Sequence, residues 1–254
     1  MQRFHHALSA VSGSLLLAWC GNAISADECR AQSGARIAPV IELYTSEGCS
    51  SCPPADKWLS GLNRNNGTPM VVQAFHVAYW DYIGWVDRFA QGAHSVRQKQ
   101  IASWNQQASI YTPQLVLDGR DWRDWHRSGS IGPAANGDAR IEIGVRRSGA
   151  DQFEALVTAL PGAPANWSAY WTVTENGHSS KVKAGENAGE LLRHDHVVRQ
   201  YTQAGNFPAA PGAAHRLTLR TIPAAQEHPR RINLVVFDPR NGRTLQAVST
   251  ACDG

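Results

Sequence analysis

The arrangement of hydrophobic and polar residues changes about halfway along this chain. In the first half, two short apolar and β-prone runs, 40–44 and 70–77, flank a segment, 55–62, whose apolar residues have helical spacing. A right-handed crossover through that helix places the two strands parallel. The aromatic segment 79–89 is too irregular for a strand, so we expect a loop at the carboxyl edge of the two strands, where open α/β sheets bind ligands.

A polar helix over 95–108 and a strand opening at Pro113 and ending at the Gly119 turn complete this first half. From residue 139 onward the pattern becomes one of alternating, turn-punctuated runs, typical of strands with one buried face. These runs are 139–146, 153–160, 168–177, 215–222 and 231–249. The Asn241-Gly242 pair predicts a hairpin within the last run. We therefore predict an α/β domain over 27–130 and a β-rich, sandwich-like domain over 131–254, separated in the loop 128–138.

The N-terminus has the three-part pattern of a secretory signal peptide, which we place at residues 1–26. Arg3 precedes an apolar segment over 7–19, which small residues follow. The segment is shorter than the roughly 20 residues that a membrane span needs, so we expect no stable membrane anchor. Cys20 leaves a lipoprotein signal as an alternative, although Trp19 fits that pattern poorly.

The net charge of the chain and its distribution argue against a nucleic-acid partner. The chain has 24 basic and 21 acidic residues, a formal net charge of +3 and no charge runs. It therefore lacks the electrostatic footprint of a nucleic-acid-binding protein. A hydrophobic content of 43% is sufficient for one large core or two ordinary ones.

Removal of the signal peptide leaves four cysteines: Cys29, Cys49, Cys52 and Cys252. An even number fits an oxidising compartment, so we expect a periplasmic or secreted protein. Cys49 and Cys52 are the close pair. Cys29 and Cys252 then remain to form a structural disulfide between the two ends of the mature chain.

The Cys49-x-x-Cys52 motif follows the first strand and precedes the first helix. A Cys-x-x-Cys beside a βαβ pattern is typical of a dithiol that exchanges with substrate thiols through a mixed disulfide. The amino end of a helix can lower the pKa of such a thiol. We expect Cys49, at the exposed turn, to be the nucleophile and Cys52, covered by the helix, to resolve. A structural disulfide and metal binding by the two thiols are the alternatives.

Three segments, ELYTSEGCSSCPPAD, HVAYWDYIGWVDRFA and YTPQLVLDGR, resemble the DUF1223 family of secreted thioredoxin-like proteins. The resemblance implies that the first domain is thioredoxin-like, with a cis peptide at Thr112-Pro113 and Pro113 facing the disulfide. It supplies no reaction, because the family has no established activity. Ala78 stands where the family pattern usually has Asp, so no acidic role is assigned there.

Further residues are assigned roles by their positions. Glu42 is a carboxylate within an apolar strand and is expected to accept the Cys52 proton, with an edge or solvent-facing position as the alternative. Thr112 and the aromatic residues Tyr79, Trp80 and Trp85 are expected to contact substrate. The aromatic side chains could instead cover the hydrophobic edge of the sheet.

These features predict a secreted thiol–disulfide oxidoreductase that acts on protein thiols or disulfides, with no cofactor and no metal ligands assigned. One alternative is a copper-binding protein that uses Cys49, Cys52 and His76, because thiolates favour Cu(I). Another is a non-enzymatic binding module in which the disulfide is inert.

Overall fold

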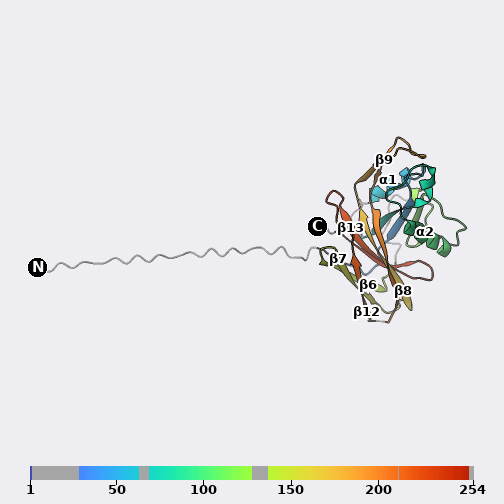
Figure 1. Ribbon diagram of the computed structural model, residues 1–254. Coiled ribbons are helices and arrows are strands. Elements are labelled where there is room, and N and C mark those ends of the chain that lie inside the picture. Colours follow the sequence, from blue (N-terminus) through green and yellow to red (C-terminus); the bar gives the residue numbers. More distant parts are fainter. Residues whose placement is uncertain (2–28, 63–68, 128–136, 211, 252–254) are drawn as a thin grey trace.

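The computed structural model describes residues 29–62, 69–127, 137–210 and 212–251, together with Met1. Strands make up most of the regular secondary structure (Figure 1). The described helices are α1 (Pro53–Gly61) and α2 (Gly92–Trp104), with the 3-10 helices η2 (Ala78–Ile83) and η3 (Trp125–Arg127). The strands are β1 (Arg30–Gln32), β2 (Val40–Thr45), β3 (Val71–His76), β4 (Gln114–Leu117), β5 (Arg120–Asp121), β6 (Ile141–Gly149), β7 (Gln152–Ala159), β8 (Asn166–Glu175), β9 (His178–Lys181), β10 (Leu191–His194), β11 (Val197–Pro208), β12 (Ala214–Arg220), β13 (Arg230–Phe237) and β14 (Thr244–Ala251).

The largest sheet has eight strands in the order β14-β13-β8-β11-β3-β2-β4-β5. As predicted, β2 and β3 are parallel, and β4 pairs with β2 in the antiparallel sense. The predicted fold class, an α/β thioredoxin-like domain followed by a separate sandwich-like domain, is wrong. One sheet contains strands from both predicted domains, so the chain has a strand-dominated fold in which the two halves share a sheet.

Strand β11 joins the two halves. Its first residue, Val197, pairs with Ala74 of β3, and the Ala74 amide also donates to the carbonyl of His196 at 2.8 Å. The rest of β11 pairs with β8, which in turn pairs with β13. The start of β11 thus pairs with the free edge of β3 at Ala74, where it satisfies part of the exposed backbone of that edge.

A second sheet, in the order β1-β6-β7-β12, packs against β8 and β13 (Figure 1). Its inward side chains share one hydrophobic cluster with Trp167 and Trp171 of β8 and Leu234 of β13. The predicted hairpin at Asn241-Gly242 connects β13 to β14 through residues 238–243, and Gly242 has a positive φ of 72°, which glycine adopts without strain. Strands β6, β7 and β12 therefore bury one face, as the alternating pattern predicts. Strands β8 and β13 differ from that prediction, because both of their faces are buried and Tyr170 and Val235 pack with residues of the first half of the chain.

Side-chain alternation along β2 determines what each helix covers. Ile41 and Leu43 pack against Leu59 of α1. Tyr44 packs on the opposite face, with Ile101 of α2. The sheet therefore has α1 on one face and α2 on the other, which decides where each polar residue of these strands points.

No helix in the described ranges is long and apolar enough to cross a membrane. The predicted signal peptide at residues 1–26 lies outside the described residues, apart from Met1. Most of the predicted boundary loop, 128–138, also lies outside them.

Candidate functional site

Cys49 and Cys52 form a disulfide at the amino end of α1, with 5.4 Å between their Cα atoms. Cys52 is the N-cap residue of α1, and Pro53 and Pro54 are the first two helical residues. Proline is tolerated there because the first N–H groups of a helix have no partner within it. The Cys49 amide donates to the Ser46 carbonyl at 3.1 Å, which closes the turn between β2 and the disulfide.

Both cysteines have exposed fractions of 0%, which corrects the expectation that Cys49 is exposed at the turn. The segment 182–190 between β9 and β10 provides one part of the cover. Glu186 Oε2 accepts from the Ser50 amide at 3.0 Å and from Ser50 Oγ at 2.8 Å. Asn187 Nδ2 donates to the Cys49 carbonyl at 3.0 Å. Two side chains of a distant segment therefore hold the turn in place through hydrogen bonds with Ser50 and with the Cys49 carbonyl.

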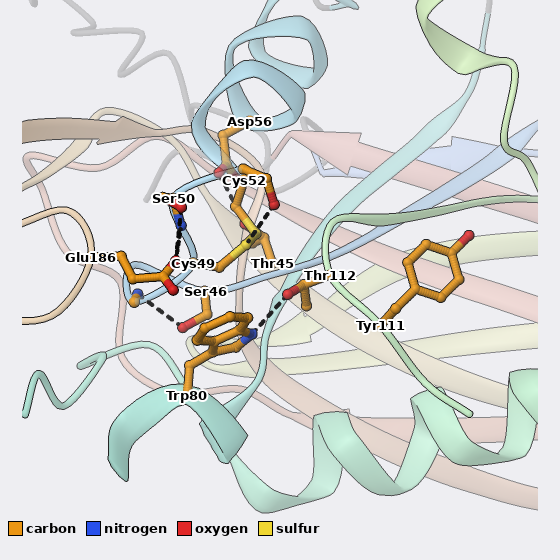
Figure 2. The surroundings of a disulfide bond; sticks show 12 residues. Thr45, Ser46, Cys49, Ser50, Cys52, Asp56, Trp80, Tyr111, Thr112 and Glu186 are labelled. Carbon is orange, nitrogen blue, oxygen red and sulfur yellow. Dashed lines mark hydrogen bonds between the residues drawn. A yellow bond between two sulfur atoms is a disulfide. The ribbon is translucent and has the colours of Figure 1, made fainter. Parts of the chain in front are cut away.

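Residues of η2 and of the turn before β4 provide the other part of the cover. The Thr112–Pro113 peptide is cis. Trp80 Nε1 donates to Thr112 Oγ1 at 2.8 Å, and Figure 2 shows both side chains beside the disulfide, whereas the ring of Tyr111 points away from it. Pro113 lines a cavity of about 250 Å³. Its other lining residues are Tyr111, Leu115, Trp122, Arg123 and Trp125.

The aromatic residues predicted to contact substrate also make internal contacts. Trp85 Nε1 donates to Glu47 Oε2 at 2.7 Å, and Tyr79 packs against the cluster around Tyr44. All three side chains of Tyr79, Trp80 and Trp85 are half-buried. They cover the end of the sheet and leave part of each ring accessible.

Glu42 does not face Cys52, which corrects the prediction that it accepts the Cys52 proton. Alternation along β2 places it on the α2 face, where Arg97 donates to both carboxylate oxygens at 2.5 and 2.9 Å. The hydroxyls of Tyr44 and Tyr170 also donate to it, at 2.6 and 3.0 Å. Burial raises the pKa of both tyrosines. Glu42 is thus part of a buried structural network.

Asp56 occupies the position that Glu42 was predicted to hold. It follows Cys52 by four residues in α1, and this spacing places both side chains on one helix face. Figure 2 shows them next to each other at the start of α1. Thr45 Oγ1 donates to Asp56 Oδ2 at 2.9 Å. Burial raises the pKa of Asp56 in spite of the two histidines His194 and His76 nearby.

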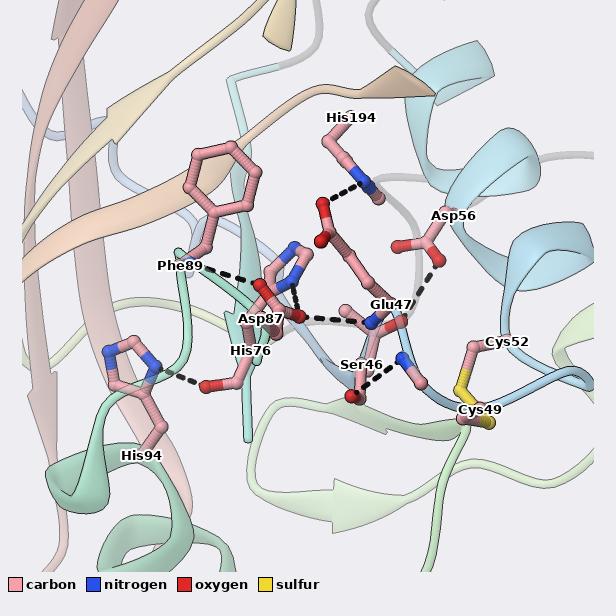
Figure 3. A network of polar contacts seen from close by, with 12 residues as sticks. Ser46, Glu47, Cys49, Cys52, Asp56, His76, Asp87, Phe89, His94 and His194 are labelled. Atoms are coloured by element: carbon pink, nitrogen blue, oxygen red, sulfur yellow. Dashed lines mark hydrogen bonds and ion pairs between the residues drawn. A yellow bond between two sulfur atoms is a disulfide. The ribbon is translucent and has the colours of Figure 1, made fainter. Parts of the chain in front are cut away.

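Two histidines extend this polar network behind the disulfide (Figure 3). His76 ends β3 in register with Thr45, so both side chains face α1. Asp87 Oδ2 lies 2.6 Å from His76 Nδ1. Burial alone lowers the pKa of His76, but nearby carboxyl groups, led by that of Asp87, outweigh this effect and raise it. In return, His76 lowers the pKa of Asp87 against the opposing effect of burial.

His194 ends β10 and is buried in the same network, where its Nε2 lies 3.2 Å from Glu47 Oε1. Burial alone raises the pKa of Glu47, but hydrogen bonds led by the one with His194 lower it. Among the described residues, Asp56, His76 and His194 form a group that could hold a metal ion, and neither thiol belongs to it. The copper alternative was therefore based on a different ligand set from the one that the fold assembles around His76.

Sequence reasoning missed Asp56 and His194 for different reasons. The spacing of Asp56 from Cys52 was a usable signal. His194 lies in a short strand with no distinctive pattern, and only the fold brings it to α1. Cys29 is buried beside the second sheet, but Cys252 lies outside the described residues, so their pairing stays a prediction.

Comparison with known proteins identifies the family of this chain. The family model DUF1223, described as a protein of unknown function, matches residues 40–237. No curated protein matches the chain. The fold is similar to a crystal structure of a protein from Agrobacterium tumefaciens, with 22% identity, coverage of 85% of this chain and 94% of that chain, and a TM-score of 0.61. It is also similar to HBP35 of Porphyromonas gingivalis, with 14% identity, coverage of 87% and 77% of the two chains, and a TM-score of 0.57. These similarities concern the fold alone, whereas the match to the family model shows that the chain belongs to the DUF1223 family.

Proposed function

We propose that this protein is a periplasmic or secreted thiol–disulfide oxidoreductase that uses the Cys49–Cys52 pair. The observation that supports this most is the position of Asp56. It is a buried carboxyl group with a raised pKa on the same helix face as Cys52. A disulfide that only staples the chain needs no proton acceptor, whereas thiol exchange does.

The proposed reaction transfers two electrons between a substrate dithiol and the disulfide. A substrate thiolate attacks Sγ of Cys49, an S–S bond forms between them, and the Cys49–Cys52 bond breaks with Cys52 leaving as a thiolate. The second substrate thiolate then attacks the mixed disulfide and releases Cys49 as a thiolate. The substrate leaves oxidised, and its two thiol protons end on Cys49 and Cys52. The same steps in reverse reduce a substrate disulfide.

Asp56 has a defined part in this scheme. When Cys52 leaves as a thiolate, the Asp56 carboxyl group can donate a proton to it, and in reverse the carboxylate accepts that proton. Burial raises the pKa of Asp56 and so favours the protonated form that the first of these steps requires. Thr45 holds the carboxyl group through its 2.9 Å hydrogen bond.

Substrate must displace part of the cover to reach Cys49. The Glu186–Ser50 contact is the weakest part, because both side chains are exposed and water competes for their hydrogen bonds. Ser50 and Ser51 are themselves exposed on the outer side of the turn. Trp80 and Thr112 then form the opposite wall, and Tyr82, 83% exposed in the same segment, supplies apolar surface for a protein substrate.

A second candidate, a binding module with an inert disulfide, is favoured by the complete burial of both cysteines. Redox equilibration of the folded protein with glutathione, followed by alkylation of free thiols, separates the two. Reversible opening of the Cys49–Cys52 bond while near-UV circular dichroism stays native supports the oxidoreductase. A disulfide that opens only when the protein is unfolded contradicts it and supports the binding module.

A further inference from the structure

We propose that His76, His194 and Asp56 form a binding site for a divalent transition-metal ion of the Zn²⁺ type. The three side chains converge behind the disulfide from β3, β10 and α1 (Figure 3). One potential ligand atom of each lies within 4.8 Å of those of the other two. All three residues are buried. This site is separate from the thiols, so it does not depend on the proposed redox reaction.

Each histidine has one ring nitrogen occupied and the other available. His76 contacts Asp87 through Nδ1, and His194 contacts Glu47 through Nε2. The remaining nitrogens, Nε2 of His76 and Nδ1 of His194, are buried and have no hydrogen-bond partner within the described part of the chain. Buried polar atoms are rarely left unpaired, because loss of water without a replacement costs about 1–3 kcal/mol. Two such atoms, on rings that both lie near the Asp56 carboxyl group, indicate a missing common partner.

The contacts with Asp87 and Glu47 also favour metal binding. A carboxylate only accepts hydrogen bonds, so the nitrogen that faces it carries the proton. In a neutral ring the other nitrogen then presents a lone pair. A carboxylate that orients a histidine in this way is the usual outer-shell partner of a metal ligand. Both histidines have such a partner here. The histidines themselves come from β3 and β10, which belong to different sheets.

The carboxyl groups of the network also favour binding of a cation. The buried residues Glu47, Asp56 and Asp87 supply three carboxyl groups, and His76 and His194 are the basic groups that contact them. A buried cation is costly unless negatively charged groups offset its charge. Glu47 and Asp87 lie beside the two imidazoles, and Asp56, once it has released its proton, supplies a further carboxylate to a divalent ion.

The ligand types indicate which ion. Two imidazole nitrogens with one carboxylate oxygen suit Zn²⁺ and neighbouring transition metals, whereas Mg²⁺ and Ca²⁺ prefer oxygen ligands alone. Metal–ligand distances of about 2.0–2.2 Å place two ligand atoms of one ion at most about 4.4 Å apart, so any separation near the 4.8 Å upper bound must shorten when an ion binds. Phe89 packs its ring against both histidines at 5.2 and 5.7 Å and supplies an apolar wall. A bound ion keeps Asp56 ionised, so the metal-bound protein and the protein in which Asp56 exchanges a proton with Cys52 are alternative states.

The test measures metal binding directly. Protein stripped with a chelator is titrated with Zn²⁺ alone by calorimetry and with Co²⁺ alone by visible absorption. Because the site is buried, the same metals are also added during refolding with the disulfide intact. We expect one ion per chain and a rise in thermal midpoint on binding. Failure of the wild type to take up either metal under both conditions overturns the proposal.

Variants locate the site. Asp87→Asn changes the carboxylate that orients His76, so it should weaken metal binding by about 10–100-fold. His194→Asn removes a ligand, so it should weaken metal binding by more than about 100-fold. His196→Asn is the matched control, because its ring is buried and its Nε2 also lacks a partner among the described residues, yet it is outside the group. Its φ of 57° suits asparagine.

Circular dichroism establishes which variants fold. If His194→Asn does not fold, Asp87→Asn carries the test, because it preserves the shape of the side chain. Replacement of both Cys49 and Cys52 by serine should leave the affinity within a few-fold of the wild type. Equal binding by His194→Asn, Asp87→Asn and His196→Asn, or loss of binding only in the serine variant, overturns the assignment.

Discussion

Asp56 follows Cys52 by one turn of α1, and its amide donates to the Cys52 carbonyl at 3.1 Å, so both side chains lie on the same side of the helix. This relationship links the disulfide to the buried polar network, since Asp56 also lies with His76 and His194. The amino end of α1 thus connects the two proposed chemistries: thiol exchange at the disulfide, and ion or proton binding in the buried polar network.

Asp56→Asn should slow disulfide exchange in the folded protein by about 100-fold or more, because asparagine cannot transfer a proton to or from Cys52. The measurement is the rate at which dithiothreitol opens the Cys49–Cys52 bond, followed by alkylation of free thiols. The matched control is Thr45→Val. It removes only the hydrogen bond to Asp56, so its rate should change much less. Equal rates for Asp56→Asn and the wild type would exclude Asp56 from the reaction.

Local sequence patterns predicted the secondary structure around the candidate site correctly. The parallel pair β2 and β3, the helix after the cysteines and the strand at Pro113 follow from periodicity and turn residues over short distances. The cis peptide at Thr112–Pro113 agrees with the family resemblance. These features depend on residues that are close in sequence, which is where pattern arguments are strongest.

The overall fold was not predictable in this way, because β11 gives little signal. Only Val197 and Val198 are buried, and the remaining positions of β11 are half-buried or exposed without a regular alternation. Without β11 the two halves look like separate domains. The same limit applies to the site: His194 and the segment 182–190 reach the disulfide through long-range packing that no local pattern encodes.

Glu186→Ala should make the disulfide easier to reach. It removes both hydrogen bonds to Ser50, so the turn loses one of its two attachments to the segment 182–190. We expect dithiothreitol to open the disulfide several-fold faster, with little change in the midpoint of urea unfolding. Glu190→Ala is the control, because Glu190 is exposed at the end of the same segment and has no side-chain contact with Ser50. If the two variants react alike, Glu186 is not part of the cover.

Glu42→Ala should reduce the free energy of unfolding by about 3–5 kcal/mol, because it leaves the buried Arg97 guanidinium without its partner. Urea unfolding measures this loss. Glu42 lies on the α2 face, so a variant that is still folded should exchange its disulfide at the wild-type rate. A marked drop in that rate at unchanged foldedness would restore Glu42 as the proton acceptor.

Stability should fall at alkaline pH because of Tyr44 and Tyr170. Burial raises the pKa of both above the usual value of about 10, so the unfolded chain releases these protons at lower pH than the folded protein. Their contribution is fully present below about pH 10 and is lost as pH rises further, by about 1.4 kcal/mol per pH unit for each tyrosine. Urea unfolding from pH 8 to pH 11 checks this range.

Tyr170→Phe is the companion variant for this pH series. It loses the hydrogen bond to Glu42 and should be less stable at pH 8, but its stability should decline less steeply above about pH 10 because one buried phenol is gone. Parallel curves for the wild type and Tyr170→Phe would show that Tyr170 does not contribute to the alkaline loss.

The order of attack gives the last prediction. Cys49 lies beneath the removable Glu186 contact, whereas Cys52 is held at the N-cap of α1 before Pro53. Substrate should therefore join Cys49 first, and Cys52 should release it. Cys52→Ala then traps partner proteins as mixed disulfides on Cys49, and Cys49→Ala traps few or none. Non-reducing gels with peptide mapping of the trapped species measure both.

Combining Cys52→Ala with Glu186→Ala should raise the yield of trapped species, because the attack on Cys49 no longer requires displacement of the carboxylate from Ser50. Adding Glu190→Ala in place of Glu186→Ala should leave the yield unchanged. Trapping mainly by Cys49→Ala would reverse the assigned order, because Cys52 would then be the residue that substrate reaches. Trapping by neither cysteine variant, even with Glu186→Ala present, would favour the inert disulfide, since an accessible and unpaired Cys49 thiol would still not react with partner proteins.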